Sequence, residues 1–246
     1  HGDIFLVWID KRDLETSVSS GEPYDGAALY YAWSHDNGQS FSPNRKIKDH
    51  VCECCRIALS FQEDGWPVLV WREVRAGSIR DHAVVRFTGS DTFSDIGRVN
   101  RDNWKIRGCP HHGPGFDLDA DGRYHVVWFS GDGEQGAGVF YASSSNRGTT
   151  FTRPFRIGRE NTFGHADITA FQDRLYLVWK ERTNNGLMGI FLMSSNDAGA
   201  TWHDQQLITY TTGGSDHPLL VTKEDEVFVS WFTRNEGYRL VRITSL

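Results

Sequence analysis

Five short apolar runs, each ending in tryptophan, recur along the 246-residue chain at intervals of 63, 57, 51 and 52 residues. The runs are Ile4–Trp8, Pro67–Trp71, Tyr124–Trp128, Leu175–Trp179 and Val227–Trp231. Each run is rich in β-branched and aromatic residues, which is typical of a strand buried on both faces. A repeat of about 50 residues built from short strands predicts a series of similar small sheets. We therefore expect an all-β chain.

A second element follows the tryptophan runs. It is complete in Ser34–Phe41 and Ser195–Trp202, and Ser144–Phe151 is a near copy with Asn146 in place of aspartate. A short Asp or Asn side chain caps the backbone N–H groups of such a turn, and a glycine supplies the positive φ. The second repeat keeps only a degenerate remnant near residues 88–93.

This Ser-x-Asp-x-Gly-x-x-aromatic pattern resembles the Asp-box of sialidases and other BNR-repeat proteins, over nearly the whole chain. The resemblance implies a β-propeller of four-stranded blades, with each box between the third and fourth strands. Five repeats are visible in one domain, 1–246, and a six-bladed ring would require further sequence. The alternative is that the boxes are turns in a different β-sandwich.

Charge and hydropathy narrow the choice of partners. The net charge is −6 and no long block of Lys and Arg is present, which argues against binding to duplex nucleic acid. No apolar run approaches the roughly 18 residues of a membrane-spanning helix. The chain begins with His1 rather than Met, so we expect a mature or trimmed form of a secreted or periplasmic protein.

Four segments that enter the expected first strands carry all four cysteines and four of the ten histidines. The segments are Cys52–Arg56, Cys109–Gly113, Gly164–Asp167 and Ser215–Pro218. In the implied propeller the first strand of each blade is innermost. We therefore expect these segments to meet at the mouth of the axial channel, on the face away from the boxes.

Thiolate and imidazole ligands together suit copper or zinc, and copper is our first expectation. The candidate metal ligands are Cys52, Cys54, Cys55, Cys109, His111, His112, His165 and His217. Asp167 and Asp216 could orient the imidazoles. Two disulfides, one of them tying Cys109 to the second repeat, are the alternative. The amine and ring of His1 are a further possible chelate.

Three functions follow from these patterns. The first is a metal-binding or metal-dependent redox role at the axial mouth. The second, implied by the resemblance, is a sialidase-like glycoside hydrolase, for which Glu73, Glu181 and Arg56 are the catalytic candidates. No arginine triad can be assigned to support it. The third is a non-catalytic propeller that binds a small molecule, a glycan or a protein, with the loop Lys11–Gly26 covering the mouth.

Overall fold

A computed structural model describes residues 3–21, 24–132, 136–159 and 162–243. Strands dominate it, and their order follows the repeat. The elements are β1 (Ile4–Asp10), α1 (Arg12–Ser20), β2 (Ala27–Ser34), β3 (Arg45–Val51), β4 (Ala58–Phe61), β5 (Pro67–Arg75), β6 (Ile79–Gly89), β7 (Thr92–Phe93), β8 (Gly97–Arg98), β9 (Gly115–Leu118), β10 (Tyr124–Ser130), β11 (Gly138–Ser144), β12 (Phe155–Ile157), β13 (Asp167–Phe171), β14 (Arg174–Arg182), β15 (Met188–Ser195), β16 (Gln206–Thr211), β17 (Leu219–Lys223), β18 (Glu226–Thr233) and β19 (Gly237–Arg242).

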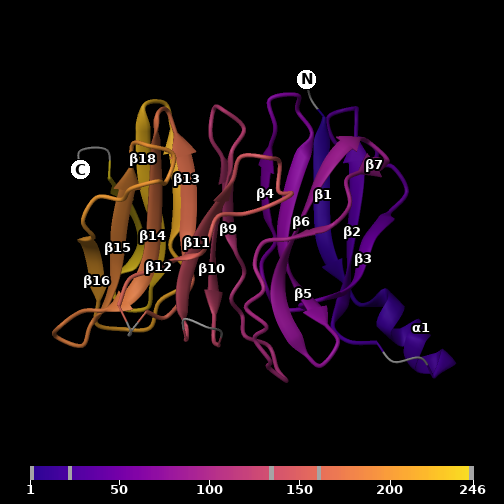
Figure 1. The fold of residues 1–246 in the computed structure, drawn as a ribbon, viewed down its shortest axis with the longest axis horizontal. Helices are drawn as coiled ribbons and strands as arrows, with labels where there is room; N and C mark the ends of the chain where they lie inside the picture. The colour runs from indigo at the N-terminus through magenta and orange to yellow at the C-terminus, as the bar shows by residue number, and fades with distance from the viewer. Residues whose placement is uncertain (1–2, 22–23, 133–135, 160–161, 244–246) are drawn as a thin grey trace.

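The chain forms a row of antiparallel sheets that follow one another in sequence order (Figure 1). The third unit is β9–β12, the fourth is β13–β16 and the fifth is the three-stranded β17–β19. The first unit (β1–β3) and the second (β4–β8) share one eight-stranded sheet, because Val51 of β3 pairs with Glu73 of β5. The described sheets do not close into a ring, so the closed propeller stays a prediction.

The tryptophan of each unit packs against the unit before it. Trp71, Trp128, Trp179 and Trp231 lie in β5, β10, β14 and β18, and all four are fully buried. Each joins a core cluster with residues of the preceding unit, as Trp231 does with Tyr176 and Val178. Trp8 lies at the corresponding place in β1, where no described sheet precedes it, and it is only half-buried. The tryptophan repeat is therefore a repeat of sheet-to-sheet contacts.

The first strands of successive units lie beside one another: β4 contacts β9, β9 contacts β13, and β13 contacts β17. Aspartates join them. Asp117 of β9 accepts hydrogen bonds from the Ser60 hydroxyl of β4 at 2.7 Å and from the Ala170 N–H of β13 at 2.9 Å. Asp167 of β13 accepts from the Leu220 N–H of β17, also at 2.9 Å. These carboxylates fix the spacing of the inner strands.

Three loops repeat one hydrogen-bond pattern, and they begin at the ends of β2, β11 and β15. In the first, the Ser34 hydroxyl donates to Asp36 at 2.8 Å, and the Asp36 carboxylate accepts from the Ser40 N–H at 2.9 Å. The loops at Ser144 and Ser195 have the same contacts. The predicted turns therefore form, between the strands where they were expected. Membership of an Asp-box family stays a prediction.

The segment after β1 differs from the expected loop. Residues 12–20 form α1, which ends at Gly21 in the left-handed conformation with φ of 75°. Tyr30 contacts this helix, since its hydroxyl donates to Asp13 at 2.8 Å. Within the described residues, no helix is long and apolar enough to span a membrane.

Candidate functional site

The four cysteine- and histidine-bearing segments lie at one end of the sheets, directly before β4, β9, β13 and β17. The strand register places the box loops at the other end. In the third unit Ser144, where the box loop starts, pairs with Tyr124, and Tyr124 pairs with Leu118, the last residue of β9. The predicted separation of the entry segments from the boxes is therefore present in the structure.

Main-chain hydrogen bonds hold two of these segments, and the residue directly before a third, to the residue that follows a tryptophan. The Cys52 N–H donates to the Arg72 carbonyl at 2.8 Å, and the Phe163 N–H donates to the Lys180 carbonyl at 3.0 Å. The Asp216 N–H donates to the Phe232 carbonyl, also at 3.0 Å. The repeat thus gives these three places the same attachment, which brings soft ligands from distant parts of the sequence to one end of the fold.

Three cysteines form a compact thiol cluster. The Sγ atoms of Cys52 and Cys55 are 2.7 Å apart, those of Cys52 and Cys54 are 3.7 Å apart, and those of Cys54 and Cys55 are 4.0 Å apart. Cys52 and Cys55 are buried, Cys54 is partly exposed, and all four cysteines of the chain are free thiols. Within the described residues, they form the one group of three or more Cys, His, Asp or Glu side chains whose ligating atoms all lie within 4.8 Å of one another.

The thiols of this cluster differ in acidity. The pKa of Cys52 is lowered to about 5, chiefly by the hydrogen bond between its sulfur and that of Cys55. The same hydrogen bond and burial raise the pKa of Cys55. Cys52 is consequently the more acidic thiol of the pair.

Cys109 lies at the edge of the thiol cluster. Its Sγ donates to the Glu53 carboxylate at 3.5 Å, and Lys11 binds the other oxygen of that carboxylate at 2.5 Å. A hydrogen bond with Cys54 is the main cause that raises the pKa of Cys109 to about 12. Cys109 is therefore a protonated neighbour of the cluster at neutral pH.

Three of the predicted histidines stack into an imidazole column. The ring centroids of His112 and His165 are 4.4 Å apart, and those of His165 and His217 are 3.6 Å apart with nearly parallel planes. Burial is the main cause that lowers the pKa of His112 to about 4 and that of His165 to about 2. The column is neutral at physiological pH. His111, in contrast, is exposed, and His1 lies outside the described residues.

Glycine 164 makes the close packing of the column possible. It has a φ of +75°, and a Cβ at this position would stand 2.6 Å from the His112 Nδ1 atom. Any other residue would therefore be strained in its backbone and would displace the ring. In this structure the rings stack on one another and the sulfurs gather separately, and a mixed Cys and His ligand set stays a prediction.

Arg72 joins the thiol cluster to the column. Its guanidinium is buried and donates to three main-chain carbonyls: His112 at 3.0 Å, Arg80 at 2.9 Å and Phe129 at 2.6 Å. Burial lowers the pKa of this guanidinium. Sequence reasoning missed Arg72, although a charged residue directly after a buried Val-Leu-Val-Trp run is a readable signal. Lys180 has the same place after Trp179 and donates to the Ser215 carbonyl at 3.0 Å.

The three catalytic candidates contact groups that belong to the framework of the fold. Glu181 is fully buried and accepts from the indole N–H of Trp179 at 2.9 Å and from the Arg159 N–H at 3.0 Å. Glu73 binds Arg75 at 2.6 Å. Arg56 donates to the Ala166 carbonyl at 3.4 Å, across to the segment before β13. Each of these contacts has a structural purpose, and none involves a second catalytic candidate.

No family model matches this sequence, and no curated protein matches it. Solved structures do resemble it. A protein of unknown function from Dyadobacter fermentans is 15% identical with a TM-score of 0.64, and the match covers 98% of this chain and 76% of that one. A PL25 ulvan lyase is 9% identical with a TM-score of 0.64, over 100% of this chain and 67% of the lyase.

Sialidases resemble the chain as well. The NanB sialidase from Streptococcus pneumoniae is 9% identical with a TM-score of 0.59. That match covers 98% of this chain and 56% of the sialidase, so the chain spans little more than half of it. At these identities the comparisons show a sialidase-like β fold.

Proposed function

We propose that this chain binds a soft metal ion, with copper(I) as the first candidate, through the thiolates of Cys52, Cys54 and Cys55. The observation that carries the proposal is the meeting of three cysteine sulfurs within 4.8 Å of one another. Thiolate ligands favour copper(I) and zinc over harder cations. The three sulfurs come from one loop between β3 and β4, so a bound ion would also staple that loop.

Two of the three sulfur spacings suit a bound metal ion. For metal–sulfur bonds of about 2.3 Å, sulfurs stand about 4.0 Å apart in a trigonal site and about 3.8 Å apart in a tetrahedral one. Cys54 meets this spacing, at 3.7 Å from Cys52 and 4.0 Å from Cys55. Cys52 and Cys55, at 2.7 Å, would separate by about 1 Å on binding. Three thiolates complete a trigonal copper(I) site, whereas tetrahedral zinc needs a fourth ligand.

Positively charged side chains near the thiol cluster also support the binding of copper(I). Arg80 lowers the pKa of Cys52, and the sulfurs of Cys52 and Cys55 interact with the Arg72 guanidinium. A copper(I) ion with three thiolates has two net negative charges. Two guanidiniums next to the cluster would compensate them where burial makes uncompensated charge costly.

Cys109 is the natural fourth ligand if the metal is zinc, because it interacts with Cys54. The imidazole column does not enter the proposed ligand set, since His112, His165 and His217 face one another. We further propose that the five units are blades of a β-propeller and that the protein is secreted or periplasmic. The resemblance to sialidases supports the propeller.

A sialidase-like glycoside hydrolase is the second candidate. The fold likeness to sialidases and to an ulvan lyase favours it. The contacts of Glu73 and Glu181 favour the metal site over this candidate, since both carboxylates are engaged beside their own strands.

A competition titration tests the metal site. Reduced protein is titrated anaerobically with copper(I) in the presence of a chromophoric copper(I) chelator, and free thiols are counted on the same sample. We expect one copper(I) per chain and at least a hundredfold weaker binding by Cys54→Ser, with unchanged folding by circular dichroism. Failure to bind copper(I) or zinc, together with a Cys52–Cys55 disulfide in protein purified without reductant, would refute the proposal and leave a disulfide-stapled fold.

A further inference from the structure

A cavity lies at the opposite end of the inner strands from the thiol cluster. It has a volume of about 930 Å³ and is bordered by the β4–β5 turn, the β9–β10 turn and the box loop after β11. The thiol cluster precedes β4, whereas Phe61, which lines the cavity, is the last residue of β4. The volume lies within the usual range for small-molecule sites.

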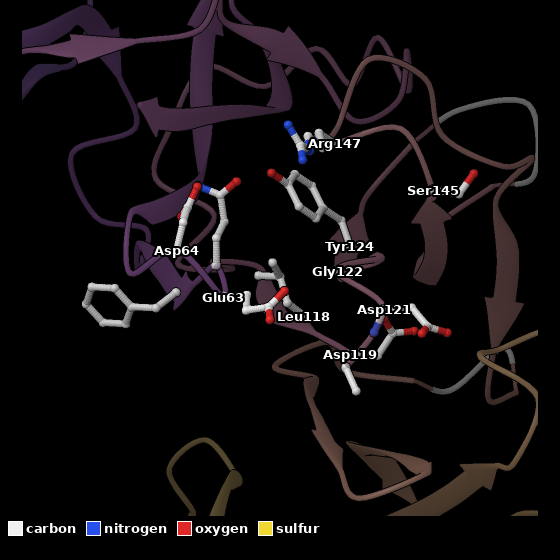
Figure 2. A pocket seen from close by; sticks show the side chains of 12 residues that line it. Glu63, Asp64, Leu118, Asp119, Asp121, Gly122, Tyr124, Ser145 and Arg147 are labelled. Atoms are coloured by element: carbon white, nitrogen blue, oxygen red, sulfur yellow. The ribbon is translucent and has the colours of Figure 1, made fainter. Parts of the chain in front are cut away.

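One buried hydroxyl in this cavity lacks a partner. Tyr124 is 1% exposed, and no described residue makes a hydrogen bond with its Oη atom. Figure 2 shows this hydroxyl directed into the space between Arg147 and Asp64. A buried polar group without a partner costs about 1–3 kcal/mol, and natural proteins rarely leave one in place. Tyr124 is therefore the feature of this cavity that most needs a ligand.

The phenol can only act as a neutral group. Burial raises the pKa of Tyr124 to about 12, so the hydroxyl keeps its proton at neutral pH. It can donate one hydrogen bond and accept another, which is what an alcohol requires of its partner. The first requirement on the ligand is thus a hydroxyl-like group that reaches the depth of Tyr124.

The rim supplies separate acceptors and a donor. Asp64 and Asp119 are engaged in their own turns, where they accept from the Trp66 and Arg123 N–H groups. Glu63, Asp121 and Arg147 are exposed, and within the described chain their side chains make no hydrogen bond or ion pair. Free carboxylates and a free guanidinium that line the same cavity can together bind several hydroxyls of one molecule.

Charge and shape narrow the ligand class. The lining contains four carboxylates and one guanidinium, which disfavours an anionic ligand. Phe61 is 50% exposed at the border and offers an apolar surface for the carbon face of a ring. From the orphan hydroxyl of Tyr124 and these groups, we propose that the cavity binds an uncharged saccharide. The proposal does not depend on the metal site.

Titration calorimetry with defined oligosaccharides tests this inference. The probes are β-1,4-linked trisaccharides of glucose, mannose and N-acetylglucosamine, together with lactose, and trigalacturonic acid is the anionic comparison. We expect at least one neutral probe to bind in the micromolar to millimolar range and trigalacturonic acid not to bind. Absence of binding by all four neutral probes at 10 mM would overturn the proposal.

The variant Tyr124→Phe removes only the orphan oxygen. We expect it to weaken binding of the positive probe about tenfold while the unliganded protein is as stable as the parent or more so, because an unpaired polar group is lost. Tyr176→Phe is the matched control, since Tyr176 is another buried tyrosine near the start of a second strand, and it should leave affinity unchanged. Equal affinity of Tyr124→Phe and parent would overturn the proposal.

Two further binding experiments distinguish saccharide binding from binding of a cationic partner and from an effect of the metal site. The first experiment uses oligolysine. If it binds the parent but not the double variant Glu63→Gln, Asp121→Asn, and no saccharide binds the parent, the cavity belongs to a cationic partner and the proposal is overturned. Cys54→Ser protein should bind the saccharide like the parent. This control keeps a failure of the metal site distinct from a failure of this cavity.

Discussion

The guanidinium of Arg72 donates a hydrogen bond to the His112 carbonyl at 3.0 Å, while the carbonyl of Arg72 accepts from the Cys52 N–H at 2.8 Å. One residue thus holds the thiol cluster with its main chain and the imidazole column with its side chain. Lys180 repeats the arrangement two units later, with the Ser215 and Phe163 main chains. In both units, the residue that follows the tryptophan holds the segments of the candidate site in place.

Replacing Arg72 should destabilise the folded protein. In Arg72→Met three buried carbonyls lose their donor, and we expect the free energy of unfolding to fall by about 3 kcal/mol or more. Denaturant unfolding measures the change. The exposed Arg234→Met is the matched control and should stay within about 0.5 kcal/mol of the parent. Equal stability of the two variants would show that Arg72 does not organise these loops.

Asp102 should make the stability of the folded protein depend on pH. Burial raises the pKa of this carboxyl, which accepts from the Trp128 indole N–H at 2.7 Å. Because the folded protein holds this proton to a higher pH than the unfolded chain, Asp102 should lower stability as the pH rises above its ordinary value of 3.8.

Asp102→Asn removes that ionisation and keeps an acceptor for the indole. We expect the stability difference between variant and parent to shift in favour of the variant as the pH rises from 3.5 to 7, measured by urea unfolding at each pH. Exposed Asp204→Asn should show no such trend. A pH-independent difference for Asp102→Asn would contradict the raised pKa.

Much of the fold can be predicted from the sequence, because the repeat shows it in local patterns. The tryptophan runs predict second strands, and the Ser34 and Ser195 turns need only contacts within a few residues. The stacking of His165 on His217 could not be predicted, since it depends on how closely β13 and β17 approach. Residues 12–20, expected as part of a loop, form a helix with no buried residue, so core packing imposes no apolar pattern there for the sequence to show.

Glu181 tests the hydrolase alternative. Because this carboxylate is buried and holds the Trp179 indole, Glu181→Gln should reduce stability by about 1–3 kcal/mol, measured by thermal unfolding. We expect the parent to give no turnover of a fluorogenic sialoside. Turnover by the parent that is lost in a folded Glu181→Gln or Glu73→Gln variant would support a glycosidase instead.

Cys109 discriminates between the two metals. Its sulfur donates to Glu53 and lies outside the three-sulfur group. Cys109→Ser should therefore bind copper(I) within about tenfold of the parent, whereas zinc, which requires four ligands, should bind at least a hundredfold more weakly. Competition titrations with each ion provide the affinities. If Cys109→Ser weakened the binding of copper(I) and zinc equally, Cys109 would be a ligand of both ions.

The most direct test of the thiol cluster is X-ray absorption at the copper edge of copper(I)-loaded protein. The account predicts a shell of three sulfur atoms at about 2.3 Å and no nitrogen shell. The same measurement on Cys54→Ser should show fewer sulfur atoms per copper. A shell dominated by nitrogen at about 2.0–2.1 Å would instead place the metal on the imidazole column and contradict the central claim.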